Sequence, residues 1–356
     1  MTSYRLGLEP IGHLAYRFLR GVLHGQVRQF QSDVADPKAA QKRRMDALLS
    51  ANSSTIFGKE HGLPAVKNFE EFRQAVPIRT HAQLIPWLDR AASGERNILT
   101  AAPITMLLET SGTTGRPKHL PVTKSWAETV QRAQRLWSLG LAREQPRMAT
   151  GKLFSLVSPK THGVSPGGIP IGSNTGRIRA AQPHWLRRRY AVPDDVMQIG
   201  DSVIRQYVAL RFGVTADVRA ITTANPSLLL LLFRRLAEWR DALSQDIYDG
   251  TCRCGPAAGL DPAVKKVLER GLKSASIPAD WSPNGLWDLA SVNCWKGGPA
   301  SFFAERLTSI VAPVPVRELG VSASEGTFAI PLSQEWPGSV LYVGGHLLEF
   351  VDADER

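Results

Sequence analysis

Apolar residues recur three and four residues apart over several stretches of the chain, which is the spacing of one face of an α-helix. The first stretch predicts an amphipathic helix near the start of the chain. Its apolar face is formed by Leu14, Phe18, Leu19, Val22 and Leu23. We expect this helix to pack on its own domain. Contact with a membrane surface is the alternative, because few acidic residues lie nearby.

The rest of the chain combines helical spacing with short apolar runs that suit strands. Helices are predicted over residues 37–50, 67–76, 125–140, 196–212 and 226–239. Strands are predicted over residues 104–108, 286–294, 314–319, 340–343 and 346–351. Ser125 and Glu128 form a capping-box pattern at one helix start, and Gly344-Gly345 is expected to join the last two strands as a hairpin. Residues 155–176 are rich in Gly, Ser and Pro and predict irregular structure.

Helices come first and strands then alternate with helices, which is the order of α/β proteins. The length of 356 residues allows one large α/β domain or two ordinary ones. With 43% hydrophobic and 21% charged residues, the composition is that of a globular protein and excludes a disordered or fibrous chain.

The composition favours neither a membrane span nor an oxidising compartment. The longest apolar run, residues 228–233, is far shorter than the roughly 20 residues of a membrane-spanning helix, so we expect no stable membrane insertion. Charged residues such as Arg5 and Glu9 interrupt any export-signal pattern. Three cysteines are too few for a disulfide framework in a chain of this size, and we therefore predict a cytoplasmic location.

The net charge of +11 favours anionic ligands. Nucleic acid is one candidate, and its best local support is the basic triplet at residues 187–189, which lies between Trp185 and Tyr190. No other feature resembles a nucleic-acid module, so we predict no nucleic-acid partner. A polyphosphate substrate accounts for the same charge.

The segment richest in chemical groups runs from Thr110 to Lys118 and reads Thr-Ser-Gly-Thr-Thr-Gly-Arg-Pro-Lys. Its two glycines let backbone N–H groups approach a ligand, its hydroxyls suit phosphate oxygens, and Lys118 adds a compact positive charge. We expect it to leave a strand and precede a helix, as a phosphate-binding loop does. It is not a Walker A loop, because His119 follows the lysine. Taken alone, a Ser/Gly/Thr-rich string also suits a surface turn.

This ordered string resembles the phosphate loop of the adenylate-forming superfamily. Further matching segments are residues 69–73, 76–78, 94–95, 168–172 and 224–227. Together they are similar to the Gretchen Hagen family of auxin-responsive acyl acid amido synthetases and its bacterial relatives, from about residue 40 onward. The resemblance implies the α/β fold of the large N-terminal domain of an adenylate-forming enzyme, with mixed sheets layered with helices. It implies one incomplete domain over residues 1–356, with residues 1–40 as an N-terminal helical segment.

The resemblance also implies site residues. Those expected to bind ATP phosphates are Thr110, Ser111, Gly112, Thr113, Thr114, Gly115 and Ser324. Lys118 is implied to neutralise charge during catalysis, and Glu325 to hold Mg²⁺, an ion that prefers hard oxygen ligands. Gly297-Gly298 resembles a backbone turn that lies along adenine, and Val321 stands where the family usually has an adenine-stacking tyrosine. Taken alone, Ser324-Glu325 also suits a helix start.

The implied reaction uses ATP to convert a carboxylic acid into an acyl-AMP and then passes the acyl group to an amine, often an amino acid. A thioester-forming acyl-CoA synthetase and a non-catalytic nucleotide-binding remnant are the alternatives. Residues 155–176 and 347–350 are expected to surround the carboxylate substrate. The family's third signature and its mobile C-terminal lid domain are not found, so we expect a fragment or a truncated product with weak or absent turnover.

Cys252 and Cys254 form a Cys-x-Cys pair. A zinc site needs four suitably spaced ligands, and neither a second pair nor a nearby histidine accompanies these two. We expect the pair to be structural.

Overall fold

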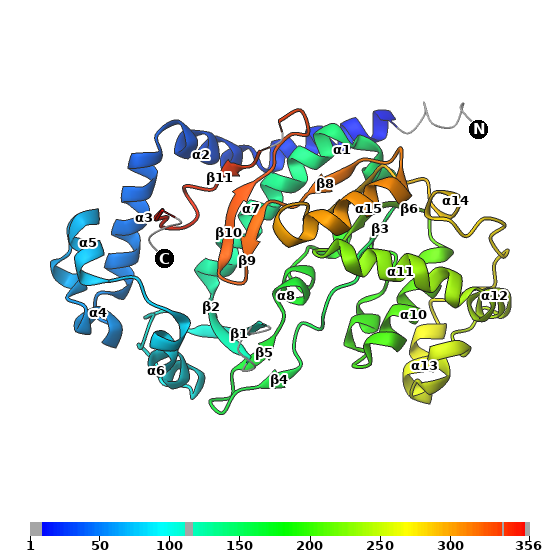
Figure 1. Ribbon diagram of the computed structural model, residues 1–356, viewed down its shortest axis with the longest axis horizontal. Helices are drawn as coiled ribbons and strands as arrows, with labels where there is room; N and C mark the ends of the chain where they lie inside the picture. Colours follow the sequence, from blue (N-terminus) through cyan, green and yellow to red (C-terminus); the bar gives the residue numbers. More distant parts are fainter. Residues whose placement is uncertain (1–8, 111–116, 337, 353–356) are drawn as a thin grey trace.

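The computed structural model describes residues 9–110, 117–336 and 338–352 (Figure 1). Within them, three β-sheets are layered with helices. The helices of residues 37–92 lie at one end of the molecule, and a helix-covered parallel sheet lies at the other (Figure 1). The arrangement confirms the predicted α/β class.

Six helices open the chain. They are α1 (Glu9–Val22), α2 (His24–Ala35), α3 (Pro37–Asn52), α4 (Ile56–Glu60), α5 (Phe69–Ala75) and α6 (His81–Ala92). The carboxylate of Asp36 caps α3 by accepting a hydrogen bond from the backbone N–H of Ala39, and Pro37 suits the first turn. The predicted helices over residues 37–50 and 67–76 are confirmed as α3 and α5.

Helix α1 leaves part of its apolar face exposed. It packs through Gly12, which lies against the backbone of Pro146, and the chain just after it buries Leu23. The apolar residues that remain exposed are Leu14, Phe18 and Val22. The expectation that this helix packs on its own domain is confirmed, because α1 contacts α7 and the turn at Pro146, but the apolar side formed by these three residues is not the side that packs. Among the described residues, no helix is both long enough and apolar enough to cross a membrane.

The first sheet has the order β2-β1-β5-β4. Its strands are β1 (Ile104–Thr110), β2 (Lys118–Thr123), β4 (Gly163–Val164) and β5 (Pro170–Gly172). Strand β1 is antiparallel to β2 and parallel to β5. The predicted strand over residues 104–108 is confirmed and extends to Thr110.

Helix α7 (Lys124–Glu144) follows β2 directly. Its N-cap is Thr123, whose hydroxyl accepts from the backbone N–H of Trp126, so the predicted cap at Ser125 is wrong. The helix also continues past Gly140, where we expected it to end. A Cβ at position 140 would lie 2.8 Å from the backbone oxygen of Leu332, so this glycine permits close packing and does not end the helix.

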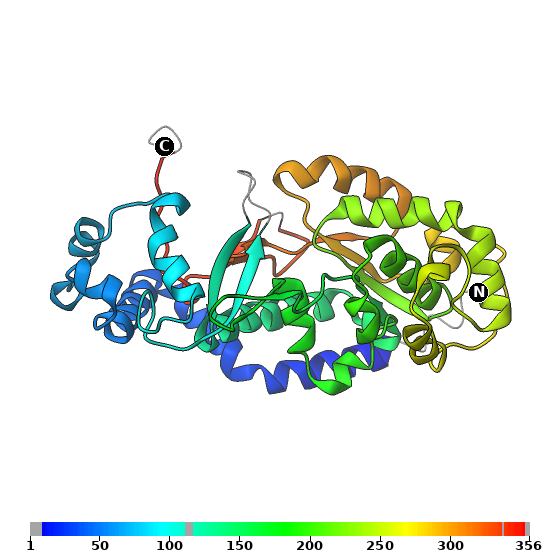
Figure 2. The ribbon, with the colours of Figure 1, turned by 90° about the horizontal axis from the view of Figure 1, so that it is seen from below.

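The second sheet is parallel throughout, in the order β3-β6-β7-β8. Its strands are β3 (Lys152–Phe154), β6 (Val218–Thr222), β7 (Ser291–Cys294) and β8 (Val316–Glu318). Helices α11 (Pro226–Glu238) and α15 (Ser301–Val311) lie in the connections between its strands and run side by side (Figure 2). The largest apolar core surrounds this sheet and includes Ile221, Leu229 and Val292. The predicted strands over residues 286–294 and 314–319 shorten to β7 and β8.

The remaining helices surround this parallel sheet and connect it to the first sheet. They are α8 (Asn174–Ala180), α9 (His184–Arg187), α10 (Ser202–Val214), α12 (Arg240–Asp249), α13 (Pro262–Glu269) and α14 (Pro283–Leu286). Short 3₁₀ turns are η1 (Leu63–Ala65), η2 (Pro146–Thr150), η3 (Asp194–Gln198), η4 (Gly255–Gly259) and η5 (Gly298–Ala300). The predicted helix over residues 226–239 is confirmed as α11, capped by Asn225, whereas the predicted helix over residues 196–212 is divided into η3 and α10. The division falls before Asp201, whose carboxylate caps α10.

The third sheet is antiparallel, in the order β11-β10-β9. Its strands are β9 (Val321–Ala323), β10 (Gly326–Ile330) and β11 (Val340–Leu341). The predicted hairpin around Gly344-Gly345 is wrong: β11 pairs with β10, and residues 346–351 form no strand. The side chain of Gln41 in α3 instead bonds the backbone of Val343, His346 and Leu348, which holds this segment along the helix.

Candidate functional site

The two ends of the predicted phosphate loop are adjacent. Thr110, the last residue of β1, and Lys118, the first of β2, are cross-strand partners, so the hairpin places the backbone of Lys118 beside the end of β1. Ser111, Gly112, Thr113, Thr114 and Gly115 lie outside the described residues. The expected direct step from loop to helix is wrong, because β2 intervenes and α7 begins only at Lys124.

A carboxylate and two imidazoles lie next to the Thr110–Lys118 pair, near the loop end of this hairpin. Glu109 of β1 lies 3.5 Å from Nε2 of His119, and its other oxygen lies 3.2 Å from Nε2 of His162. His119 comes from β2 and His162 from the segment before β4. The cluster joins β1, β2 and the irregular segment next to residues 111–116.

Ser324 and Glu325 form the two-residue turn of the β9–β10 hairpin, in which Ala323 pairs with Gly326. The alternative interpretation of this pair as a helix start is therefore wrong. The turn lies beside the beginning of α7 (Figure 1), where the indole N–H of Trp126 donates to the backbone oxygen of Glu325 at 2.6 Å. The Glu325 side chain is exposed, and no ion pair joins it to another described residue. This bond ties the Glu325 turn to the helix that follows Lys118 and β2.

Glu318 connects the parallel sheet to that hairpin. One carboxylate oxygen accepts from the backbone N–H of Lys296 at 2.8 Å, and the other accepts from Leu319 at 2.8 Å and Gly320 at 3.1 Å. The indole of Trp137 in α7 donates to the backbone oxygen of Glu318. The loop after β7 and the turn into β9 are thus fixed to one side chain.

Gly297 and Gly298 lie in that loop, at the carboxyl edge of the parallel sheet. A Cβ at either position would meet no atom within 4 Å among the described residues, so this backbone faces open space. Gly298 has a φ of +56°, which favours glycine. Ligands of α/β proteins typically bind outside the carboxyl ends of parallel strands. Val321, 57% exposed, begins the neighbouring hairpin.

Arg177 in α8 is a charged group buried near the Glu325 turn. Its guanidinium lies 5.1 Å from the ring centroid of Trp126 and donates to the side-chain oxygen of Asn174. Burial lowers the pKa of Arg177 to about 10, so the group is still charged at neutral pH. Within the described part of the chain, no carboxylate forms an ion pair with it.

The segment over residues 155–176 has little regular structure, as predicted, and is tightly packed. Gly172 lies against the backbone of Lys160, and Gly176 against that of Ser158, so neither position has room for a side chain. The Ser173 hydroxyl donates to the backbone oxygens of Ser158 and Pro159. These contacts pack the segment closely beside β1, with which its strand β5 pairs.

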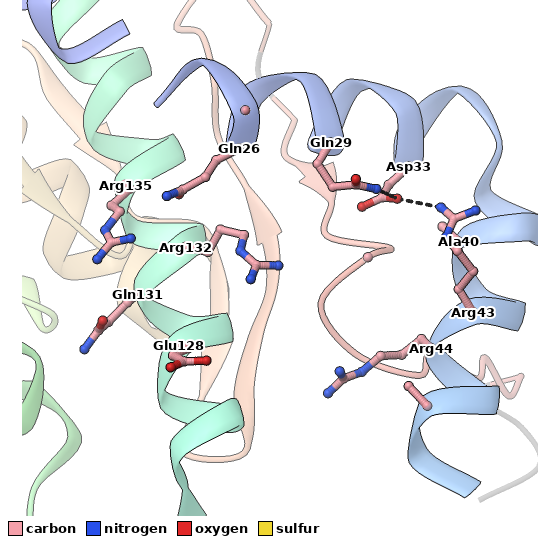
Figure 3. Close-up of a pocket in the computed structure, with 13 residues that line it drawn as sticks. Gln26, Gln29, Asp33, Ala40, Arg43, Arg44, Glu128, Gln131, Arg132 and Arg135 are labelled. Atoms are coloured by element: carbon pink, nitrogen blue, oxygen red, sulfur yellow. Dashed lines mark hydrogen bonds and ion pairs between the residues drawn. The ribbon is translucent and has the colours of Figure 1, made fainter. Parts of the chain in front are cut away.

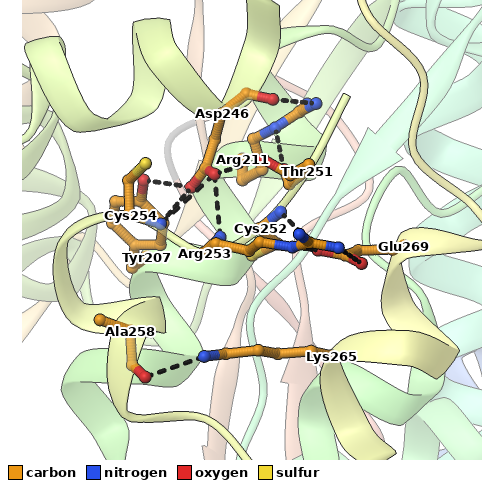
Figure 4. Close-up of polar contacts among 10 residues, drawn as sticks. All are labelled: Tyr207, Arg211, Asp246, Thr251, Cys252, Arg253, Cys254, Ala258, Lys265 and Glu269. Atoms are coloured by element: carbon orange, nitrogen blue, oxygen red, sulfur yellow. Dashed lines mark hydrogen bonds and ion pairs between the residues drawn. The ribbon is translucent and has the colours of Figure 1, made fainter. Parts of the chain in front are cut away.

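Two sequence features have structural roles. In the basic triplet, Arg187 pairs with Asp194, and Arg189 donates to two backbone oxygens near β3. Near the Cys-x-Cys pair, Asp246 accepts from the Tyr207 hydroxyl at 2.7 Å and from the backbone N–H of Cys254 at 3.1 Å (Figure 4). Burial raises the pKa of Asp246, but these hydrogen bonds and those from Thr251 and Arg253 hold it below its usual range. The network fixes the Cys-x-Cys turn to α10 and α12.

Sequence reasoning missed Trp126, Arg177 and Glu318 as residues of this region. Trp126 has the spacing of a packing residue, and only its contact with Glu325 gives the indole N–H a role. Glu318 lies near the carboxyl end of a predicted strand, where ligands of α/β proteins typically bind. That position was the one sequence feature that could have indicated a role for Glu318 in the site. Arg177 lies just after a glycine-rich segment and carries no signal of its own.

Comparisons with known proteins show which family the chain resembles. The family model described as "GH3 family N-terminal domain" matches residues 26–316. A rice protein named probable indole-3-acetic acid-amido synthetase GH3.4 is 28% identical over 274 residues, which cover 72% of this chain and 42% of that protein. A Nicotiana attenuata protein named jasmonoyl-L-amino acid synthetase JAR4 is 27% identical over 337 residues, covering 87% of this chain and 57% of that one.

Among solved structures, "AtGH3.15 acyl acid amido synthetase in complex with 2,4-DB" matches with a TM-score of 0.75 and 18% sequence identity. The match covers 86% of this chain and 56% of that one, and it shows a shared fold. Because the family model covers most of the chain, the protein belongs to the GH3 family. The chain spans about half the length of the curated relatives it matches.

Proposed function

We propose that the protein activates a carboxylic acid with ATP and transfers the acyl group to an amine, forming an amide. Its family membership supports this reaction, because its relatives are named as synthetases that join acids to amino acids. The observation that carries the proposal is the hydrogen bond from Trp126 to Glu325, since it brings the Glu325 turn to the helix that follows the Thr110–Lys118 hairpin.

The residues present fit a nucleotide and a magnesium ion. Glu325 offers an exposed carboxylate, an oxygen ligand of the kind Mg²⁺ prefers, and Ser324 on the same turn offers a hydroxyl for a phosphate oxygen. The open backbone at Gly297-Gly298 leaves room for a flat base, and the exposed Val321 offers an apolar surface beside it. We assign the phosphates of ATP to Thr110, Lys118 and residues 111–115. Bound Mg²⁺ would neutralise negative charge on the phosphate oxygens.

The proposed chemistry needs positioning and charge neutralisation more than acid–base groups. A carboxylate oxygen of the substrate attacks the α-phosphorus of ATP, and the bond to the leaving pyrophosphate breaks. Lys118 neutralises charge that develops on the phosphorus oxygens. The amine nitrogen then attacks the acyl carbon, AMP leaves with the electron pair, and the nitrogen loses a proton to water.

Arg177 is our choice for the group that attracts the substrate carboxylate. It is a buried cation stacked on Trp126, and the rigid segment over residues 155–176 lies just before it in the chain. An acyl-CoA synthetase would share the first step. The product formed with an amino acid or with coenzyme A distinguishes an amide-forming enzyme from a thioester-forming one. We also propose a cytoplasmic location, since all three cysteines are free thiols.

ATP–pyrophosphate exchange with a panel of carboxylic acids tests the first step. Because turnover is expected to be weak, we expect slow carboxylate-dependent exchange, and we expect Lys118→Ala and Glu325→Ala each to reduce it to background. Matched controls are Lys124→Ala, an exposed lysine at the start of α7, and Glu305→Ala, an exposed glutamate in α15.

Full exchange in the Glu325→Ala variant would overturn the metal assignment. Absence of exchange with every acid, together with no ATP binding, would overturn the proposed activation. Adding amino acids or coenzyme A to the activated acid and identifying the product by mass spectrometry then decides between amide and thioester. We expect the amide.

A further inference from the structure

A cavity of about 750 Å³ lies between α2, α3 and α7, away from the candidate active site. Figure 3 shows its lining side chains, with α2 on one side and α3 and α7 facing each other across the opening. The backbone of Gly344 forms part of its wall. This volume is in the range of small-molecule sites, which enclose roughly 300–1,000 Å³.

The cavity is distinct from the site proposed for ATP. Its α7 residues are Glu128, Gln131, Arg132 and Arg135. A different side of α7 carries Ala133 and Trp137, which pack on the third sheet, and the turn at Glu325 contacts Trp126. The two sites therefore share a helix but use different sides of it.

Positive charge dominates the lining. Four arginines, Arg43 and Arg44 from α3 with Arg132 and Arg135 from α7, face two carboxylates, those of Asp33 and Glu128. Oδ1 of Asp33 already has partners within the protein: it accepts hydrogen bonds from the side chains of Arg43 and Gln29, each at 2.8 Å (Figure 3).

Three of these arginines have no ion pair. Among the described residues, Arg44, Arg132 and Arg135 pair with no carboxylate, and Nε of Arg44 is buried without a hydrogen-bond partner. Burial lowers the pKa of Arg44; the nearby Tyr342 opposes this effect and the positive charge of Arg132, which lines the same cavity, adds to it. Like charges held together without a counter-ion are unfavourable, and a bound anion removes that cost.

A neutral group of the lining adds hydrogen-bonding capacity. Oε1 of Gln26 is buried and has no partner among the residues the structure describes. Buried polar groups without partners are uncommon in folded proteins and are typical of ligand sites.

We propose that this cavity binds a phosphate-bearing small molecule through Arg44, Arg132 and Arg135. Guanidinium groups suit phosphate because their planar N–H donors can bond two oxygens at once. A site bounded by three helices suits a compact ligand better than an extended strand of nucleic acid. The side-chain oxygen of Gln26 would accept a hydrogen bond from an uncharged donor of the ligand.

Calorimetric titration of the full chain with inorganic phosphate and pyrophosphate tests the proposal. We expect pyrophosphate to bind and the double variant Arg44→Gln/Arg132→Gln to bind it at least about tenfold more weakly. The matched control is Arg17→Gln/Arg20→Gln, which removes the same charge from exposed positions of α1. Citrate, a carboxylate polyanion, is expected to bind more weakly than pyrophosphate.

The phosphate loop is a second place where pyrophosphate can bind, so the titration is repeated with Lys118→Ala. We expect one binding event to persist in that variant and to disappear when Arg44→Gln/Arg132→Gln is added. The proposal would be overturned if Arg44→Gln/Arg132→Gln bound pyrophosphate as tightly as the wild type. It would also be overturned if Lys118→Ala alone abolished all pyrophosphate binding. Neither result bears on the ATP-dependent activation.

Thermal unfolding without ligand gives an independent readout. An anion site predicts that Arg44→Gln/Arg132→Gln leaves the ligand-free protein as stable as the wild type, or more stable, because two facing charges are removed. Pyrophosphate should then raise the Tm of the wild type and not that of the variant. A ligand-free variant that is clearly destabilised would assign these arginines a structural role and contradict the proposal.

Discussion

The indole nitrogen of Trp126 lies 2.6 Å from the backbone oxygen of Glu325, although the two residues are 199 positions apart in the chain. Trp126 belongs to the first turn of α7, and Glu325 to the tip of the β9–β10 hairpin. The hydrogen bond holds the hairpin tip against the first turn of the helix. The guanidinium of Arg177 lies over the same indole ring.

Trp126→Phe keeps an aromatic ring but removes the N–H donor. We expect ATP–pyrophosphate exchange to fall about tenfold or more, because small misplacements of a catalytic group are costly. Circular dichroism and the unfolding midpoint should change little. The comparison is Trp185→Phe, which alters an exposed tryptophan in α9. Unchanged exchange in Trp126→Phe would contradict a positioning role for this bond.

Glu318→Gln tests the carboxylate that connects the Lys296 loop to the turn before β9. The amide has one oxygen to replace two, so at least one of the three backbone N–H groups loses its acceptor. We expect a loss of stability of about 1–3 kcal/mol and ATP binding about tenfold weaker. Denaturant titration and calorimetry measure the two effects. Glu305→Gln, on an exposed face of α15, should show neither.

His346 predicts a dependence of stability on pH. Burial lowers its pKa from 6.5 to about 4, and the positive charge of Arg44 adds to the effect. The unfolded chain therefore binds a proton before the folded one does as the pH falls. This contribution to stability is complete above pH 6.5 and is lost progressively between pH 6.5 and about 4.

Unfolding in denaturant at pH 7 and pH 5 measures this loss. We expect about 1–2 kcal/mol of the difference to disappear in His346→Gln, after allowance for partial exposure of the ring. His184→Gln, an exposed histidine at the start of α9, should leave the difference unchanged. An identical pH difference in the wild type and in His346→Gln would show that the imidazole is not responsible.

Gln41 anchors the C-terminal segment to α3. Its amide donates to the backbone oxygens of Val343 at 2.5 Å and His346 at 2.8 Å, and its oxygen accepts from Leu348 at 2.8 Å. Gln41→Ala should cost about 1–3 kcal/mol. Hydrogen exchange of residues 342–348 should accelerate, while that of β6 and β7 stays slow. Gln31→Ala, at an exposed position of α2, is the control and should leave both regions unchanged.

Local chemistry made much of the fold predictable. Interactions within a few residues explain the helix start at Asn225 and Pro226 and the helix over residues 37–50. The order of helices and strands follows from such local patterns. Errors arose where distant backbone decides the outcome. Gly140 looked like a helix end, but its lack of a side chain serves the approach of Leu332, which lies far along the chain.

The same limit applies to the candidate site. Glu325 and Lys118 could be chosen from short motifs, because residue type and order within each motif suggest phosphate and metal chemistry. Trp126 and Glu318 could not, because their roles depend on which backbone groups lie opposite them after folding. The cavity arginines come from α3 and α7, and only packing brings them together.

The candidate active site draws one part from each sheet: Lys118 from the first, Gly297-Gly298 from the loop after a strand of the second, and Glu325 from the third. Each sheet has its own neighbours and can loosen separately from the others. Inactivation on heating should therefore begin below the temperature at which the parallel-sheet core melts, since opening any one of the three sheets is enough to separate the groups.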